Sequence, residues 1–93
     1  MKRKRPRAAA AIRYRSTIDD APRVTASGRG LLADRILALA AENGVPVVAD
    51  PNLADLLAAL DLDVEIPPSL YRAVAEVLVW VYGLEAEAKQ RHP

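Results

Sequence analysis

The pattern of apolar and polar residues is most distinctive in the last third of the chain, where residues 66–84 read IPPSLYRAVAEVLVWVYGL. After two prolines, apolar residues recur at helical spacing on one face, at Leu70, Val74, Val77, Leu78 and Val81. The opposite face is hardly more polar, since it carries Ala73, Ala75, Val79, Trp80 and Tyr82. A helix this apolar must be covered on two sides, either by its own sheet or by a partner.

Shorter patterns predict further elements ahead of this helix. Segments rich in β-branched, aromatic or alternating apolar residues favour strands, and runs with apolar residues at helical spacing favour helices. The predicted strands are 8–14, 23–27, 45–49 and 62–66, and the predicted helices are 28–43, 51–60 and 68–84. Strands that alternate with helices indicate an α/β domain. We therefore expect a small mixed β-sheet of about four strands surrounded by helices.

Local signals mark where the first two helices end and begin. Asn43-Gly44 is typical of a helix that ends with a residue in the left-handed backbone conformation. Asp50 followed by Pro51 is typical of a helix start. The residues expected to be buried are Leu32, Ile36, Leu39 and Ala40 in the first helix and Leu53, Leu56, Leu57 and Leu60 in the second. Pro46 places the start of the third predicted strand at an edge of the sheet.

Composition places the chain among small soluble domains. Its 93 residues are 52% hydrophobic and 27% charged, which argues against disorder. Cysteine is absent, so disulfides and thiolate metal sites are excluded. No apolar run reaches the roughly 18–20 residues that span a bilayer, and no signal peptide is recognisable. We therefore expect a cytoplasmic protein.

Charge is distributed unevenly along the chain. Residues 1–15 carry seven basic groups and no acid, whereas residues 42–87 carry nine acids and one base. Residues 1–7 thus form a basic arm, with cationic side chains at Lys2, Arg3, Lys4, Arg5 and Arg7. The arm suits anionic lipid, nucleic acid or an acidic partner, but a solvated, disordered tail is the more usual explanation of such a segment. Residues 85–93 read as a second polar tail.

The candidate catalytic and metal-binding residues do not form a recognisable site. His92 is the only histidine and stands next to the last residue, so a Ser-His or His-metal centre is not expected. Asp61, Asp63 and Glu65 alternate as in a calcium loop but lack its other ligands. Gly28-Arg29-Gly30 lacks the remaining residues of a phosphate-binding loop. We expect no enzyme, no cofactor and no metal.

Three aromatic residues, Tyr71, Trp80 and Tyr82, lie on the long apolar helix. Exposed aromatic side chains are the usual anchors of protein interfaces, and buried ones belong to the core. Both interpretations remain open for Tyr71 and Trp80. Nucleic-acid binding is not expected, because the aromatic residues lie in the acidic body and the bases in the arm.

Three stretches together resemble a known family: APRVTASGRGLLADRILALAAENGVPVV at 21–48, DPNLADLL at 50–57 and EIPPSLYRAVAEVLVWVY at 65–82. They closely resemble the cytoplasmic domain of the type III secretion export switch proteins, the FlhB family of flagella with YscU and SpaS as its counterparts in injectisomes. The resemblance covers residues 8–84. It implies a small sheet surrounded by helices, attached in full-length members to a membrane domain that this chain lacks. It also implies a role at the export gate.

The same resemblance implies a cleavage site that this chain has lost. Family members cleave themselves within Asn-Pro-Thr-His, just before the strand matching residues 8–14, and the asparagine side chain is the nucleophile. The aligned positions here are Lys4, Arg5, Pro6 and Arg7. The two asparagines of the chain precede Gly44 and Leu53, so neither forms an Asn-Pro pair. Autocleavage is therefore not expected.

Further departures from the family fall in the second helix. Asp55 stands where the family usually has arginine, and Ala58 where it usually has an aromatic residue. We take Tyr71, Trp80, Tyr82 and Asp55 as the candidate partner surface.

Two functional hypotheses follow. The first is a non-enzymatic component or regulator of flagellar or type III export, equivalent to the fragment that follows cleavage. It would bind export proteins or substrates, with the arm in peripheral contact with anionic membrane. The second is an adaptor that keeps the fold but acts outside secretion. An enzyme is the least expected.

Overall fold

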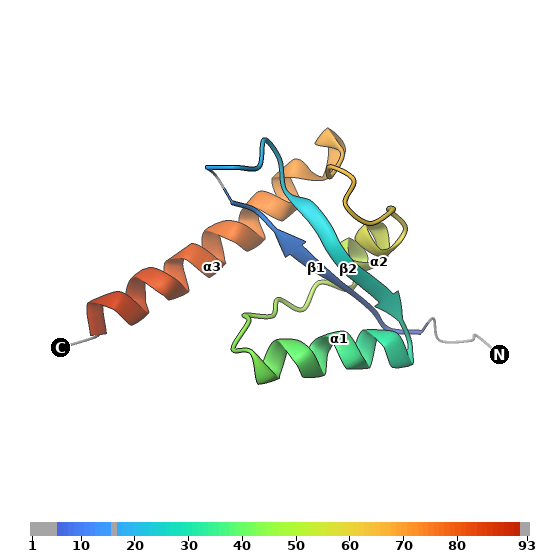
Figure 1. Cartoon of the computed structure of the whole chain (residues 1–93), viewed down its shortest axis with the longest axis horizontal. Helices are drawn as coiled ribbons and strands as arrows, with labels where there is room; N and C mark the ends of the chain where they lie inside the picture. The colour runs from blue at the N-terminus through green and yellow to red at the C-terminus, as the bar shows by residue number, and fades with distance from the viewer. Residues whose placement is uncertain (1–5, 16, 92–93) are drawn as a thin grey trace.

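The computed structural model describes residues 6–15 and 17–91. Two strands are followed by three α-helices, with a short 3₁₀ turn ahead of the last (Figure 1). The elements are β1 (Ala8–Arg13), β2 (Arg23–Arg29), α1 (Leu31–Glu42), α2 (Pro51–Ala58), η1 (Pro68–Leu70) and α3 (Tyr71–Arg91). The expected α/β class is confirmed.

The sheet of the described residues has two strands, so the expected four are not shown. β1 and β2 pair antiparallel, with Ala8 opposite Arg29 and Ile12 opposite Val24, and an irregularity between Ala11 and Ile12. The strand predicted at 45–49 is wrong, since that segment has no regular secondary structure and pairs with no described strand.

The strand predicted at 62–66 is also wrong apart from one bridge. Glu65 pairs with Arg23 in an isolated antiparallel bridge, and Leu62 and Asp63 form a turn. Asp63 adopts a φ of 64°, which belongs to the left-handed region and reverses the chain inside the expected strand. Its backbone N–H then donates to the carbonyl of Val24 at 2.9 Å.

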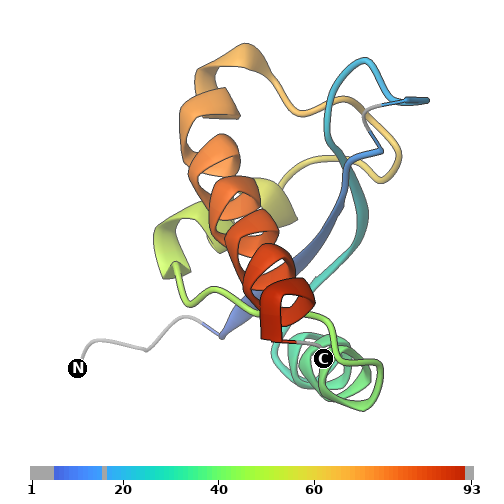
Figure 2. The same ribbon diagram turned by 90° about the vertical axis from the view of Figure 1, so that its left-hand side faces the viewer.

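Helices cover both faces of the hairpin. Ala9 pairs with Gly28, and a Cβ at Gly28 would lie 2.3–2.8 Å from the side chain of Leu32, so this face contacts α1. The other face carries Ile12 and Val24 and packs against α2 and the start of α3. Figure 2 shows α2 and α3 on the same side of the two strands.

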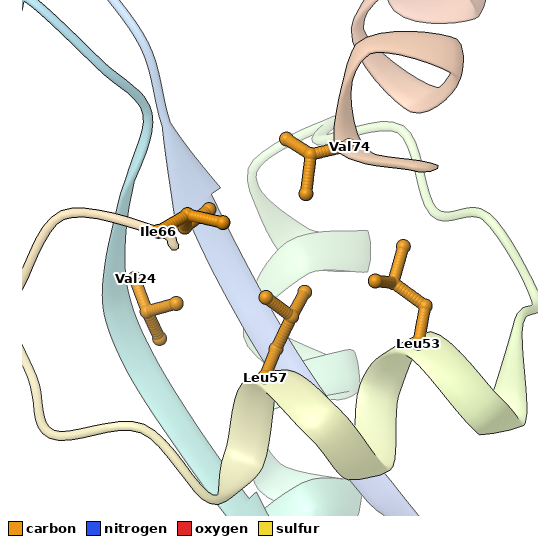
Figure 3. Packing of buried hydrophobic residues seen from close by; sticks show 5 residues of the cluster. All are labelled: Val24, Leu53, Leu57, Ile66 and Val74. Atoms are coloured by element: carbon orange, nitrogen blue, oxygen red, sulfur yellow. The ribbon is translucent and has the colours of Figure 1, made fainter. Parts of the chain in front are cut away.

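The core is small and lies between the hairpin, α2 and the start of α3. It is formed by Val24, Leu53, Leu57, Ile66 and Val74, whose side chains point toward one another (Figure 3). The predicted start of α2 is confirmed, because the Asp50 side chain accepts a hydrogen bond from the N–H of Leu53 at 3.1 Å and Pro51 follows. Leu53 and Leu57, one turn apart, are therefore both directed into the core. Leu56, also expected there, is exposed.

The predicted buried face of α1 is largely wrong. Leu32 is 53% exposed and Leu39 is 48% exposed, whereas Ala33 is completely buried. The side chain of Leu32 lies over Gly28 at the start of the helix, and Ala33 beside it is the residue of α1 that becomes fully buried. The predicted end is confirmed: Gly44 has a φ of 65°, and Asn43 donates from its side chain to the Leu39 carbonyl at 2.8 Å.

The apolar helix that dominates the sequence is covered over only part of its length. Val74 is 1% exposed, and Val77 and Leu78 pack partly against the core. Beyond them Val79 is 70% exposed, and the helix continues to Arg91, past its predicted end at residue 84. The radius of gyration is 14.3 Å, against about 12 Å for a compact domain of this length, because α3 projects from the body (Figure 1). Within the described ranges no helix has the length and hydropathy to cross a membrane.

Candidate docking surface

The predicted basic arm falls mostly outside the described residues. Lys2, Arg3, Lys4 and Arg5 lie there, as does His92. Arg7 is exposed and forms an ion pair with Asp34 at 3.7 Å. Its backbone carbonyl accepts a hydrogen bond from the N–H of Gly30 at 2.8 Å, so one of the amide groups considered for anion binding is already used.

The four residues of the predicted partner surface do not share one face. Successive residues of an α-helix are 100° apart, so Trp80 lies opposite Tyr71 on α3 and Tyr82 lies on the side of Tyr71. All three are between 42% and 47% exposed. Asp55, on α2, accepts a hydrogen bond from Arg29 at 2.5 Å, and its carbonyl accepts a second from the same guanidinium at 3.2 Å.

Trp80 borders a shallow groove of about 390 Å³ beside α3. Its walls are Ala73, Glu76, Val77 and Trp80 on α3 and residues 47–50 on the segment that precedes α2. Trp80 thus borders a surface that combines apolar side chains with the acidic residues Asp50 and Glu76. Tyr71 and Tyr82 do not line this groove.

A larger groove of about 670 Å³ adjoins it, and this groove was not predicted from the sequence. Residues 6–12 form one wall and residues 45–51 the other, with Leu53 and Leu57 of α2 and Val77, Leu78 and Val81 of α3 between them. The two grooves share Val47, Val48, Ala49, Asp50 and Val77, so they form one continuous surface. The signal in the sequence was the apolar run VPVV, which we assigned to a buried strand.

The acidic residues considered for metal binding, Asp61, Asp63 and Glu65, do not form a metal site. Glu65 forms an ion pair with Arg23 at 3.5 Å, and the same arginine donates to the carbonyl of Asp63 at 2.6 Å. Among the side chains that the structure describes, no three histidine, cysteine or acidic residues gather as metal ligands would.

The turn between β1 and β2 is organised by Asp19, the one buried acidic side chain among the described residues. Its carboxylate accepts a hydrogen bond from the backbone N–H of Arg15 at 2.9 Å and one from the guanidinium of Arg13 at 3.4 Å. The Arg15 hydrogen bond, followed by the charge and hydrogen bond of Arg13, holds the pKa of Asp19 below its ordinary value.

We therefore expect Asp19→Asn to lower the free energy of unfolding at neutral pH. A carboxyl group whose folded pKa is lowered stabilises the fold above its unfolded pKa, near about 3.9, and loses this effect as the pH falls through the folded pKa. Urea unfolding of both proteins at pH 7 and pH 3 is the measurement. A difference in stability that stays the same at both pH values would contradict the assignment.

Known proteins with similar sequences and structures identify the family to which the chain belongs. The family model described as the FlhB HrpN YscU SpaS family matches residues 6–81. The chain belongs to this family. It is 40% identical to YlqH of Bacillus subtilis over 92 residues, covering 98% of this chain and 99% of YlqH. It is also 45% identical to the flagellar biosynthetic protein FlhB of Yersinia enterocolitica over 78 residues, 83% of this chain but 20% of that protein.

A solved structure supports the same assignment. The cytoplasmic domain of FlhB from Shewanella putrefaciens superposes with a TM-score of 0.82 at 34% identity, over 94% of this chain and 70% of that one. The expected FlhB-like fold is therefore confirmed at the level of the domain. Membership of the family connects the chain with flagellar biosynthesis and type III protein export, although it spans only about a fifth of the FlhB relative.

Proposed function

We propose that this chain is a non-enzymatic, FlhB-like component or regulator of flagellar or type III protein export, acting in the cytoplasm. The observation that carries the proposal is the match of nearly the whole chain to the cytoplasmic domain of FlhB, in both sequence and fold. In this proposal the chain corresponds to the fragment of the export switch protein that follows the cleavage site.

Its mode of action is docking to export proteins or export substrates. The apolar side chains left exposed between α3 and residues 45–51 support this mode, because a small domain rarely leaves such a surface open unless something binds there. Trp80 is the central aromatic anchor of the proposed surface. Tyr71 and Tyr82 provide partner contacts on the opposite face of α3. The basic arm adds a peripheral contact with anionic membrane or an acidic partner.

The loss of the cleavage motif is part of the proposal. Pro6 and Arg7 occupy two of the four aligned positions and are exposed, and Lys4 and Arg5 lie outside the described residues. None of the four side chains is an asparagine that could attack its own carbonyl.

The purified protein is accordingly expected to remain intact. Mass spectrometry after prolonged incubation at 37 °C should show one species at the full mass of 10.1 kDa. A fragment that begins near residue 5 or 6 would show that the chain cleaves itself after all.

Complementation tests the function. A flagellated strain whose FlhB lacks the part of its cytoplasmic domain that this chain resembles is supplied with the chain, and secreted flagellar protein is measured in the culture medium. We expect secretion to be restored at least in part. The Val74→Asp variant, which cannot form the core, serves as the inactive control. A well-folded, well-expressed wild-type chain that restores no secretion would contradict the proposal.

A further inference from the structure

The shallow groove beside α3 combines apolar and acidic side chains. The residues of α3 that line it recur at spacings of three or four, so they lie on one face of the helix: Ala73, Glu76, Val77 and Trp80. Residues 47–50 form the other wall, which consists of two valines, an alanine and Asp50. Two carboxylates therefore share a groove of about 390 Å³ with the indole ring of Trp80, which is 46% exposed.

Neither carboxylate is neutralised by a strong ion pair with a described residue. Asp50 accepts a hydrogen bond from the backbone N–H of Leu53 at 3.1 Å, which caps α2 but brings no cationic side chain. Glu76 lies 3.9 Å from Arg72, in a pair whose two side chains are both largely exposed. Such an exposed pair contributes little, and Arg72 does not line the groove. The groove therefore carries an excess of negative side-chain charge.

A groove with this lining suits lysine and arginine side chains. Both have a long aliphatic stem, which can lie on the valines of the two walls, and a cationic end, which can reach a carboxylate. A guanidinium or ammonium group placed over an exposed indole ring also gains a cation–π interaction. The ligand that fits Asp50, Glu76 and Trp80 together is therefore a short peptide segment with several basic residues.

The chain carries such a segment in its own sequence. Lys2, Arg3, Lys4 and Arg5 are four successive cations, and the first acidic residue of the chain is Asp19. These four residues lie outside the described ranges and precede Pro6 directly. The charge of the basic arm is thus complementary to that of the groove.

We propose that the basic arm of one copy of this chain binds the shallow groove of a second copy. Its cations pair with Asp50 and Glu76, and one of them stacks on Trp80. The proposal concerns self-association and goes beyond the proposed function.

The position at which the arm begins favours a second copy over the same chain. Arg7 is held at the start of α1, because its carbonyl accepts a hydrogen bond from the N–H of Gly30 at 2.8 Å. Figure 1 shows this start of β1 toward one end of the long axis of the molecule and α3 extending toward the other. Five residues span at most roughly 18 Å, whereas the longest extent of the molecule is 54 Å. The groove of a neighbouring copy is therefore more accessible to the arm.

Two copies can exchange their arms reciprocally. A two-fold arrangement repeats the same contact twice, so the second arm binds at a high effective concentration once the first is in place. Trp80 is also the anchor of the docking surface proposed above. An export protein that binds there consequently competes with the arm, so self-association covers the docking surface until such a protein is present.

Sedimentation equilibrium of the full chain at low salt, from micromolar to millimolar concentration, tests the inference. We expect a dimer of twice the 10.1 kDa chain mass, whose dissociation constant rises by about tenfold or more at high salt. Trp80 is the only tryptophan of the chain, so its fluorescence emission should change over the same concentration range. A chain that stays monomeric throughout, or a dimer that leaves this emission unchanged, would overturn the inference.

Three full-length variants assign the dimer to the arm and the groove. Glu76→Lys reverses a charge in the groove and should weaken dimerisation by about tenfold or more. Glu42→Lys makes the same change at an exposed position that lines neither groove, and should leave dimerisation unchanged. The neutral-arm variant, in which Lys2, Arg3, Lys4 and Arg5 are all replaced by glutamine, should be monomeric. Circular dichroism verifies that all three are folded.

Mixing two monomeric variants gives the most specific result. Glu76→Lys retains the arm, and the neutral-arm variant retains the groove, so together they should form a mixed dimer through one arm–groove contact. A neutral-arm variant that dimerises like the wild type, equal weakening by Glu76→Lys and Glu42→Lys, or no association in the mixture would each contradict the inference. The complementation experiment measures secretion by the wild-type chain, so the two proposals can fail separately.

Discussion

Replacing Val74 by aspartate is expected to unfold the domain, whereas the same replacement at Trp80 is expected to leave it folded. Val74 is 1% exposed and lies among Leu57 and Ile66 in the core. A carboxylate there would lose its hydration with no cation to pair with, at a cost of several kcal/mol. A domain of this size has about 5–10 kcal/mol of stability in total, so little or none remains.

Trp80 lies six residues further along the same helix but is 46% exposed. A carboxylate at this position keeps much of its hydration, and the loss is confined to contacts across the shallow groove. We expect the Trp80→Asp variant to retain a cooperative thermal transition with a modest decrease in Tm. Far-UV circular dichroism of both variants distinguishes the cases. If Trp80→Asp were as unfolded as Val74→Asp, the indole would belong to the core and not to a docking surface.

Gly28→Ala is expected to destabilise the domain by about 1–3 kcal/mol. An added Cβ would lie 2.3 Å from Cγ, 2.5 Å from Cδ2 and 2.8 Å from Cβ of Leu32. The first two atoms can move by side-chain rotation, but the third is fixed to the backbone of α1. The helix must therefore shift away from β2, which weakens the packing of Ala33. Urea unfolding at equilibrium measures the loss.

Gly83 provides a matched control for the same substitution. It lies in α3, and an added Cβ there meets nothing within 4 Å. Gly83→Ala removes the conformational freedom of a helical glycine and is expected to stabilise the domain by about 0.5–1 kcal/mol. If Gly28→Ala were as stabilising as Gly83→Ala, the close approach of α1 to the hairpin would be wrong.

The parts of the fold that depend on neighbouring residues in the sequence were predictable. Asp50 and Pro51 start α2, and Asn43 and Gly44 end α1, because capping uses the chain's own adjacent backbone groups. The strands β1 and β2 were likewise recognisable one by one from the residues at 8–14 and 23–27. Local chemistry was sufficient in each of these cases.

The strands expected at 45–49 and 62–66 were predicted wrongly. A strand needs a neighbouring strand to pair with, and the residue pattern alone does not show whether one is present. The segment 45–49 has the composition of a strand, but it pairs with no strand among the described residues. In 62–66 the left-handed conformation of Asp63 interrupts the alternation. The burial of α1 was misjudged for a similar reason, because the close approach of the helix at Leu32 to Gly28 depends on the surface of the hairpin that it faces.

The candidate site was predicted only in part. The sequence correctly marked α3 as a helix too apolar to be self-sufficient, and its apolar residues at Val79, Trp80 and Tyr82 are indeed exposed. Grouping Tyr71 with Trp80 overlooked their opposite positions on the helix, which helical geometry alone could have excluded. The large groove arises where β1, residues 45–51, α2 and α3 meet, and no single stretch of sequence reveals such a meeting.

Affinity capture from the native host tests the central claim, which is that this chain works by docking to the protein export machinery. The wild-type chain, a version lacking residues 1–5 and the Val81→Glu variant are used in parallel, and bound proteins are quantified by mass spectrometry. We expect flagellar or type III export proteins to be enriched with the wild-type chain and reduced by Val81→Glu. Enrichment of proteins unrelated to secretion, with no export protein among them, would contradict the account and favour an adaptor that acts elsewhere.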